Sequence, residues 1–274
     1  MISLTVDVEE GFHGLWPSSH KTMVRYRNES PKGTFIKPLQ SILHLFERNR
    51  VRSTFFVLGR IAEVFPEVVE EISNSGHEVA SHGYVHVDLT RIVLTELEEM
   101  ERKNCRILAK ITGEMPRGFR APFSRINPAI ISLLSEIGYI YDSSVSPTLR
   151  IPGWWSYSGA PLFPHRVNVG EGEFFEVPVS VFPYFRLPIS GWFLRNFGVL
   201  YAKMAIKWFL HRGMPVIIYV HPFDVDSNVP RLRGVGFHVT RRCGEYTLRA
   251  MRNLIETFDC PKMPIQDMLE KTMA

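Results

Sequence analysis

The sequence predicts an α/β protein built as a distorted (β/α) barrel of about seven to eight mainly parallel strands. Short runs of β-branched and aromatic residues alternate with longer amphipathic stretches along most of the 274 residues, a pattern typical of repeated βα units. The number of strand candidates is close to the eight of a closed barrel. Two strand candidates also end in ionisable residues, at the rim where parallel α/β barrels build their active sites.

The first strand, expected over residues 2–9, has the clearest pattern in the chain. Apolar and polar residues alternate strictly from Ile2 to Glu9. We therefore expect the even-numbered side chains to pack against helices and the odd-numbered ones, including Asp7, to face the barrel interior. Glu10 continues the even-numbered face, so Glu9 is the better candidate ligand for a site inside the barrel.

The other elements follow in order along the chain. Further strands are expected over residues 52–58, 77–82, 117–121, 138–142, 174–179 and 215–221, with a weaker candidate at 261–264. In the strand at 215–221, His221 falls on the side opposite Val216. Helices are expected over 35–49, 61–75, 90–112, 127–137, 193–212 and 245–258.

We expect residues 1–274 to form a single domain, because no repeat, low-complexity tract or linker composition divides the chain. An irregular insertion rich in Pro, Gly and aromatic residues is expected over residues 143–192. Its aromatic side chains, Trp154 and Trp155 among them, are candidates for sugar-stacking surfaces beside a cleft. The alternative is that they anchor a packed loop.

Composition places the chain among ordinary globular proteins, with 45% hydrophobic and 22% charged residues, and excludes disordered, collagen-like and coiled-coil classes. Lys and Arg number 32 against 28 Asp and Glu, and no basic block stands out, so a nucleic-acid partner is not predicted. Three dispersed cysteines fit a reducing compartment better than a disulfide framework or a thiolate zinc site.

Location is predicted from the N-terminus and from the apolar stretches. The chain reaches Asp7 before an apolar signal-peptide core could form. The longest apolar helical stretch, residues 193–210, contains Arg195, Lys203 and Lys207, which oppose insertion across a bilayer. We therefore expect a cytoplasmic protein without a transmembrane segment. The alternative is a cytoplasmic protein that lies at the membrane surface, at a site of glycan assembly. The sequence carries no signal for the oligomeric state.

Two histidines, His82 and His86, stand four residues apart, a spacing that suits two ligands of one metal ion. Asp7 and Glu9 share the inward face of the first strand, so one carboxylate could complete the ligand set while the other acts as a base. Three protein ligands and an open position are typical of catalytic zinc. The alternatives are hydrogen-bonded histidines without metal, and carboxylates that cap a helix or form a salt bridge.

Arg120, Asp142 and His221 also end short strands. An arginine at the rim can hold a carboxylate ionised and oriented, and a carboxylate beside an imidazole raises its pKa and suits it as a general acid. A structural ion pair, a turn or a helix cap is the alternative for each.

Taken in order, these segments resemble the polysaccharide deacetylases, the NodB-homology group also named carbohydrate esterase family 4. The resemblance covers nearly the whole chain and rests on residues 5–10, 53–59, 76–86, 119–122, 141–144 and 219–222. The Asp7-Val8-Glu9 form of the first motif, and Phe185-Arg186-Leu187-Pro188 before a long helix, resemble the branch linked to bacterial exopolysaccharide and surface-glycan loci.

The resemblance implies metal-dependent hydrolysis of an N-acetyl group on an amino sugar of a polysaccharide, surface glycan or precursor. The metal would be zinc in the first place, with cobalt, nickel or iron as alternatives. The implied roles are general base for Asp7, metal ligands for Glu9, His82 and His86, general acid for His221, orientation of the base for Arg120, partner of the acid for Asp142, and oxyanion stabilisation for the backbone N–H near Phe123.

Two departures from the common family pattern bear on these roles. The family usually has adjacent aspartates in the first motif, where this chain has Asp7 and Glu9. It usually has Pro-Pro-Tyr after the arginine, where this chain has Ala121-Pro122-Phe123. The first departure affects the ligand set and the second the oxyanion donor.

Four other functions are alternatives to N-deacetylation. A deformylase or a cyclic-amide hydrolase would need the same water activation and the same residues. An iron site with Glu9, His82 and His86 as a facial triad is disfavoured because the pattern is βα throughout. A non-catalytic glycan-binding module would leave Asp7 and His221 without a role.

Overall fold

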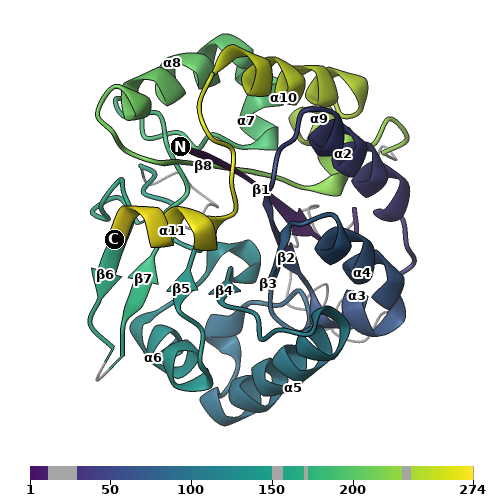
Figure 1. Ribbon diagram of the computed structural model, residues 1–274, viewed down its shortest axis with the longest axis vertical. Helices are drawn as coiled ribbons and strands as arrows, with labels where there is room; N and C mark the ends of the chain where they lie inside the picture. Colours follow the sequence, from purple (N-terminus) through teal and green to yellow (C-terminus); the bar gives the residue numbers. More distant parts are fainter. Residues whose placement is uncertain (12–29, 150–156, 170–171, 230–235, 274) are drawn as a thin grey trace.

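An eight-stranded sheet forms the centre of the molecule, with helices around its outside (Figure 1). The computed structural model describes residues 1–11, 30–149, 157–169, 172–229 and 236–273. The strand order is β6-β7-β5-β4-β3-β2-β1-β8, and all neighbouring pairs are parallel except β6 and β7. The strands are β1 (Ile2–Val8), β2 (Thr54–Val57), β3 (Glu78–Ser81), β4 (Gly118–Phe119), β5 (Tyr141–Asp142), β6 (His165–Val167), β7 (Phe174–Glu176) and β8 (Val216–Val220). The predicted distorted barrel of mainly parallel strands is confirmed.

The helices follow the predicted order with two breaks. They are α2 (Ile36–Arg48), α3 (Gly59–Val64), α4 (Pro66–Asn74), α5 (Leu94–Thr112), α6 (Pro128–Ile137), α7 (Gly191–Phe197), α8 (Val199–Leu210), α9 (Phe237–Thr240), α10 (Glu245–Thr257) and α11 (Ile265–Met273). The single helix predicted over 61–75 is two, because Pro66 cannot continue α3 and instead starts α4. The helix predicted over 193–212 is broken at Gly198, which has a φ of 85°.

Some elements were not predicted. The strand β6 and the helices α9 and α11 lie in segments where no such element was expected, and residues 261–264 contribute only an isolated bridge between Ile2 and Lys262. Among the described residues, no helix combines the length and the apolar character needed to cross a membrane.

The first strand has the predicted parity. Ile2, Leu4, Val6 and Val8 belong to a buried apolar cluster that also contains residues of α2, α8 and α10. Thr5 and Asp7 face the other way, where the guanidinium of Arg120 donates hydrogen bonds to both side chains. The alternation therefore separates an apolar outer layer from a polar barrel interior.

An irregular segment closes the barrel between β7 and β8. Within the predicted insertion of residues 143–192, the backbone N–H of Ser180 donates to the Ile217 carbonyl (3.0 Å), and the N–H of Ile217 donates to Ser180 Oγ (2.9 Å). Ser190 forms one further bridge, to Tyr219. The closure thus consists of single hydrogen bonds and bridges instead of a strand ladder.

Helix α11 covers the end of the barrel at which the parallel strands begin. Its first residue, Ile265, donates its N–H to Thr54 Oγ1 (2.8 Å), and Gln266 donates its N–H to Glu78 Oε2 (3.2 Å), both acceptors lying at strand starts. In Figure 1 this helix, in yellow, lies in front of the sheet. The opposite end, at which the strands terminate, holds the ionisable residues described next.

Candidate metal and catalytic site

Glu9, His82 and His86 bring three ligand atoms together at the carboxyl ends of β1 and β3. One oxygen of Glu9, Oε2, lies 2.6 Å from His86 Nε2 and 3.8 Å from His82 Nε2. The ligand atoms of all three residues lie within 4.8 Å of one another, and all three side chains are buried. Two imidazole nitrogens and one carboxylate oxygen form a donor set that suits a zinc-type ion with an open position.

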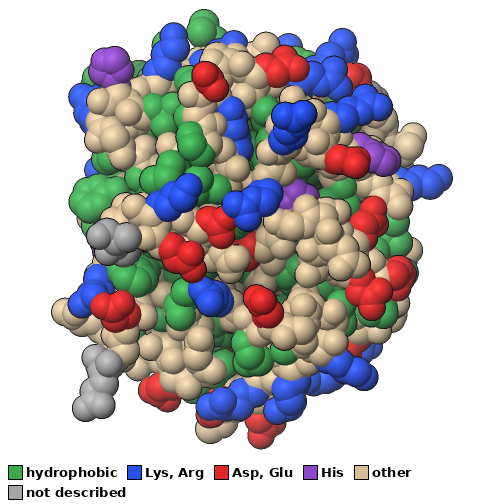
Figure 2. Space-filling view, in the orientation of Figure 1, with side chains coloured by type: hydrophobic (Ala, Val, Ile, Leu, Met, Phe, Trp, Pro, Cys, Tyr) green, Lys and Arg blue, Asp and Glu red, His purple; other side chains and the backbone are tan. Residues whose placement is uncertain are grey.

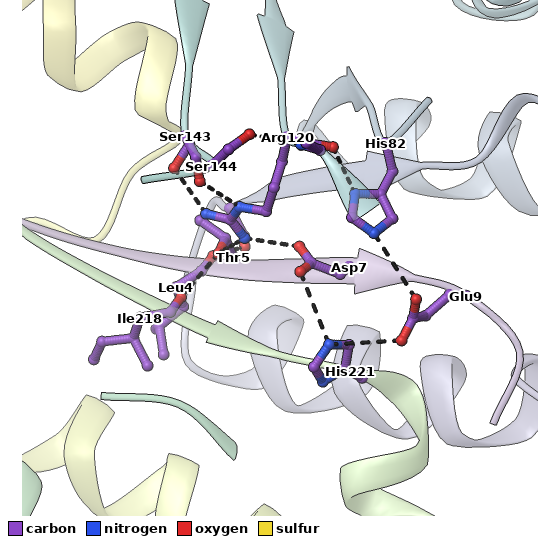
Figure 3. A network of polar contacts seen from close by, with 12 residues as sticks. Leu4, Thr5, Asp7, Glu9, His82, Arg120, Ser143, Ser144, Ile218 and His221 are labelled. Atoms are coloured by element: carbon purple, nitrogen blue, oxygen red, sulfur yellow. Dashed lines mark hydrogen bonds and ion pairs between the residues drawn. The ribbon is translucent and has the colours of Figure 1, made fainter. Parts of the chain in front are cut away.

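His82 is held in one orientation by the backbone. Its Nδ1 lies 2.8 Å from the carbonyl oxygen of Arg120, as Figure 3 shows. Because a carbonyl oxygen only accepts, Nδ1 carries a proton, and Nε2 is the nitrogen that faces Glu9. Burial alone would raise the pKa of Glu9, but the imidazoles of His86, His221 and His82 outweigh it and hold this pKa well below the usual value.

The neighbouring carboxylate, Glu10, points away from this site. It accepts hydrogen bonds from the backbone N–H groups of Lys32 (2.5 Å), Gly33 (2.6 Å) and Thr34 (3.1 Å), just before α2 begins. The hydroxyl of Thr34 also donates to it. The alternation of the strand therefore gives two adjacent glutamates different surroundings, one facing the histidines and one fixing a loop.

Asp7 is bound to Arg120 inside the barrel (Figure 3). The guanidinium Nη1 of Arg120 donates to Asp7 Oδ1 over 2.7 Å, and both side chains are buried. Arg120 is itself fixed, because its Nε donates to the Ser143 carbonyl (3.0 Å) and its Nη2 to Ser143 Oγ (2.9 Å). The second oxygen of Asp7, Oδ2, lies 3.9 Å from His221 Nε2. One oxygen is thus anchored while the other faces the site.

His221 lies on the other side of Glu9, at the end of β8. Its Nε2 is 3.6 Å from Glu9 Oε1, and its Nδ1 is 3.2 Å from Asp224 Oδ2. Burial alone would lower the pKa of His221, but the carboxylates of Glu9, Asp224 and Asp7 together raise it to about 9. The imidazole is therefore protonated at neutral pH in this arrangement.

Asp224, which was not predicted, is the carboxylate paired with His221. It lies in the 3-10 turn Pro222–Val225 and also accepts a hydrogen bond from the backbone N–H of His221 (2.8 Å). The completely buried guanidinium of Arg195 on α7 binds its other oxygen, with Nε at 2.9 Å and Nη2 at 2.7 Å. A Cβ at Gly191 would lie 2.1 Å from Asp224 Oδ2, so only glycine fits there.

The predicted pairing of Asp142 with His221 is wrong. Strand β5, which carries Asp142, is separated from β8 by four strands in the sheet. The Asp142 carboxylate instead accepts hydrogen bonds from the hydroxyl (2.6 Å) and the N–H (3.0 Å) of Ser144 and lies across from Glu176. Burial raises the pKa of both carboxyls. Since Ser144 Oγ accepts the N–H of Ala121 (2.7 Å), this cluster supports the segment that follows Arg120.

The turn after Arg120 brings Phe123 against the metal-ligand candidates. Phe123 has a φ of 58° and a ψ of 11°, left-handed values that few non-glycine residues adopt, and its ring centroid lies 4.3 Å from that of His86. Its backbone N–H as oxyanion donor stays a prediction. Trp154 and Trp155, the predicted sugar-stacking residues, lie outside the described residues.

Two family models match the chain. Residues 37–141 match the model of the polysaccharide deacetylases, and residues 143–260 match a domain of unknown function (DUF3473). Both matched segments contribute strands to the same sheet, β2 to β5 from the first and β6 to β8 from the second.

Relatives and solved structures agree with the first of these models. A peptidoglycan deacetylase-like protein, FGM2, of Gibberella zeae is 40% identical over 93 residues, which is 34% of this chain and 28% of that protein. A peptidoglycan-N-acetylglucosamine deacetylase of Bacillus cereus is 35% identical over 85 residues, 31% of each chain. The matched part thus spans about a third of these relatives' length.

The crystal structure of a putative polysaccharide deacetylase from Mycobacterium smegmatis has the same fold over nearly the whole chain. It superimposes with a TM-score of 0.68 at 21% identity, over 98% of this chain and 88% of that one. The fold, the matching family model and the order of the motifs lead to one conclusion. Residues 37–141 are a domain of the polysaccharide deacetylases, the NodB-homology group also named carbohydrate esterase family 4, within a chain that has this fold throughout.

Proposed function

We propose that this protein is a metal-dependent hydrolase that removes N-acetyl groups from amino sugars of a polysaccharide, a surface glycan or its precursor. The observation that carries the proposal is the placement of Asp7 and His221 beside the set of Glu9, His82 and His86. Amide hydrolysis needs a base for the attacking water and an acid for the departing amine. Both lie within reach of one position at the end of the barrel.

Glu9, His82 and His86 would hold the divalent ion, zinc in the first place and cobalt, nickel or iron as alternatives. Such an ion, when bound, lowers the pKa of water and polarises the acyl carbonyl. The hydrogen bond from His82 Nδ1 to the Arg120 carbonyl fixes the rotation of this ring and makes Nε2 the nitrogen available to the ion.

Asp7 is the general base of the proposed reaction. The ion pair with Arg120 anchors one oxygen of its carboxylate and leaves Oδ2 facing the site, where it takes a proton from the attacking water. The buried guanidinium also fixes the rotation of the carboxylate, so the accepting oxygen is already placed when substrate binds. The backbone N–H of Phe123 is the proposed donor to the oxyanion.

His221 is the general acid. Its Nδ1–H is held by Asp224, which leaves Nε2–H directed toward Asp7 and Glu9, where the departing amine would stand. An amine leaves poorly as an anion, so a proton delivered to the sugar nitrogen as the C–N bond breaks is needed for turnover. The carboxylates around the imidazole keep that proton available at neutral pH.

Relatives with similar sequence bear the name peptidoglycan deacetylase, which supports an N-acetylated sugar polymer or its precursor as the substrate. The form of the first motif, Asp7-Val8-Glu9, favours a role in exopolysaccharide or surface-glycan metabolism. The proposed location is the cytoplasm or its membrane boundary.

A mass-spectrometric screen tests the proposal. N-acetylhexosamine oligomers, nucleotide-linked sugars and lipid-linked sugars would be incubated with the protein and zinc, cobalt, nickel or iron, and products analysed for loss of acetyl. The Asp7→Asn variant is the matched control. Loss of formyl, or opening of a cyclic amide, without loss of acetyl from any sugar would replace the proposal by one of the two related hydrolase functions.

A further inference from the structure

Exposed apolar side chains concentrate on the loop before α7 and on the helices α7 and α8. Five of the twelve large apolar residues that are exposed among the described residues lie in this stretch, and each is between 50% and 74% exposed. They are Tyr184, Phe185, Phe197, Leu200 and Met204. We name these five residues, together with Lys203 and Lys207, the α7–α8 face.

Aromatic contacts make the α7–α8 face continuous across chain segments. The buried ring of Phe182 stacks against Phe185 at 5.6 Å and against Tyr201 at 5.2 Å. Tyr201 in turn lies 5.8 Å from Phe197. The exposed rings of the loop and of the helices therefore pack against the same two rings, Phe182 and Tyr201, and form one surface.

Helix α8 presents apolar and cationic residues on the same side. Leu200, Lys203, Met204 and Lys207 recur at spacings of three and four, which place them on one side of a helix. The buried residues Ala202, Ala205, Ile206 and Phe209 occupy the opposite side. Each lysine follows one of the apolar residues by three positions, so a surface that takes up Leu200 and Met204 meets a lysine head group about one turn further along from each.

The chain segment that carries this face has no acidic residue. No Asp or Glu occurs from residue 177 to residue 223, although the chain contains 28 acidic residues in 274. Of the Lys and Arg residues in this stretch, only Arg195 is buried, and Asp224 neutralises it. The adjacent segment adds exposed Phe237 and, after it, Arg241 and Arg242. Figure 2 shows several Lys and Arg side chains along the upper edge of the molecule, with a few Asp and Glu side chains among them.

We propose that the α7–α8 face docks onto the surface of an anionic lipid bilayer. Aromatic and aliphatic side chains next to lysines are typical of surfaces that insert a shallow apolar layer among lipid head groups while the lysines bind the phosphates. The aliphatic Leu200 and Met204 are poor platforms for a sugar ring, and the absence of acidic residues over this stretch complements a negatively charged surface.

The helix that carries Phe197 of the α7–α8 face starts beside the candidate site. Helix α7 starts at Gly191, which packs against Asp224, and Asp224 holds His221. Docking would therefore bring the rim of the barrel to the membrane boundary. Together with the proposed function, this points to an N-acetylated sugar carried on a lipid as the substrate that the docked protein reaches.

Vesicle flotation of the full chain tests the docking. Vesicles of phosphatidylcholine alone and with phosphatidylglycerol would be compared, using wild type, Leu200→Gln/Met204→Gln and Lys203→Glu/Lys207→Glu. The matched controls are Val93→Gln/Met115→Gln and Lys37→Glu/Lys110→Glu, which change exposed residues of the same types elsewhere. Wild type and both controls should bind the anionic vesicles, and each variant of the α7–α8 face should lose at least about tenfold in binding.

Hydrolysis of a small water-soluble N-acetyl sugar is measured in parallel and should be the same in all these variants, so failure of docking and failure of the proposed function are distinguished. Absence of wild-type binding to anionic vesicles overturns the docking proposal, as does an equal loss in the control variants. A wild-type dimer that the variants dissociate would assign the face to a second copy instead. A raised KM of the variants for a soluble sugar polymer would assign it to the substrate.

Discussion

The guanidinium of Arg195 and the carboxylate of Asp224 meet at 2.7 Å, and both side chains are almost completely removed from solvent. The remaining oxygen of Asp224 binds both the ring and the backbone N–H of His221. Arg195 is fixed in turn, because its Nη1 donates to the carbonyl oxygens of Val239 (2.7 Å) and Arg241 (3.0 Å). The proposed general acid is therefore positioned by a buried ion pair that draws on three segments of the chain.

The Asp224→Asn variant should lose amide hydrolysis by about two to four orders of magnitude, because His221 loses the carboxylate that orients its ring and helps to raise its pKa. It should lose much less activity toward 4-nitrophenyl acetate, whose phenolate leaves without a proton. The ratio of the two rates is the measurement. Asp142→Asn, a carboxylate not paired with His221, should leave this ratio unchanged.

A double-mutant comparison sharpens this assignment. Asp224→Asn combined with His221→Ala should cost little more than His221→Ala alone, because the two residues act as a unit. Asp142→Asn combined with His221→Ala should give additive losses. Additive losses for Asp224 and non-additive losses for Asp142 would instead support the pairing of Asp142 with His221.

Glu9→Ala should weaken zinc affinity by about one to two orders of magnitude or more. Loss of a residue that only hydrogen-bonds to a metal ligand typically has an effect of this size, and loss of a ligand itself should have at least the same effect. Glu10→Ala should leave zinc affinity nearly unchanged, because its carboxylate binds backbone N–H groups of residues 32–34. It should instead lower the free energy of unfolding by about 1–3 kcal/mol. Titration calorimetry and urea unfolding of both variants separate the two roles, and the reverse pattern would refute them.

Asp7→Asn should keep its metal and lose turnover by about two to four orders of magnitude, because an amide cannot accept the proton from water. Metal analysis after dialysis and the rate of acetyl release are measured on the same sample. Glu10→Gln is the matched control, with an equal change of charge on the other face of the strand. A near-wild-type rate in Asp7→Asn would remove Asp7 as the base.

Acid should destabilise the protein through His77. Burial lowers the pKa of this histidine from 6.5 to about 4, and its ring lies 4.9 Å from Phe55. Between these two pH values the unfolded chain binds the proton and the folded chain does not, so this contribution to stability is complete above pH 6.5 and is lost as the pH falls toward 4. The loss amounts to about 3 kcal/mol at most.

Urea unfolding at pH 7, 5 and 4 checks this expectation. The His77→Leu variant should lose less stability between pH 7 and 4 than wild type, since it has no group to protonate. His44→Leu, which removes an exposed histidine of α2, should keep the wild-type pH dependence. Identical pH dependence in wild type and His77→Leu would contradict the assignment.

The sequence was most informative where the alternation of one strand determines the direction of several side chains. The period of two in β1 predicted that Asp7 and Glu9 face the interior and that Glu10 does not, and the structure places all three accordingly. Helix positions were also predicted, but breaks at Phe65 and Gly198 were not, because amphipathic spacing continues across both.

The carboxylate that pairs with His221 could not be predicted from the residues at which the strands end. Every strand that ends in an ionisable residue reaches the same rim, but only the strand order shows which residues are neighbours. Asp142 and His221 end separate strands, whereas Asp224 is local to His221. The signal was the His-Pro-x-Asp pattern, in which a side chain three positions on reaches back to the backbone as in a helix capping box.

The role of Arg195 in positioning Asp224 was not predicted from the sequence. Within an apolar helical stretch it served only as evidence against a membrane span, and its burial against Asp224 depends on a contact between residues 29 positions apart. Long-range pairing of this kind leaves no periodic trace. The same holds for the segment around Ser180 that joins β7 to β8.

That joining segment is held by fewer hydrogen bonds than the rest of the sheet. Glu9 and His82 follow strands of the continuous ladder of β1, β2 and β3. His221 ends β8, which pairs with β1 from Val216 to Val220 on one side and meets the closure held by Ser180 and Ser190 on the other. Amide hydrogen exchange should accordingly be faster along the closure than along the ladder. A bulky acylated sugar would then be accommodated by a small displacement of the closing segment, while the proton donor and the metal ligands beside it keep their places.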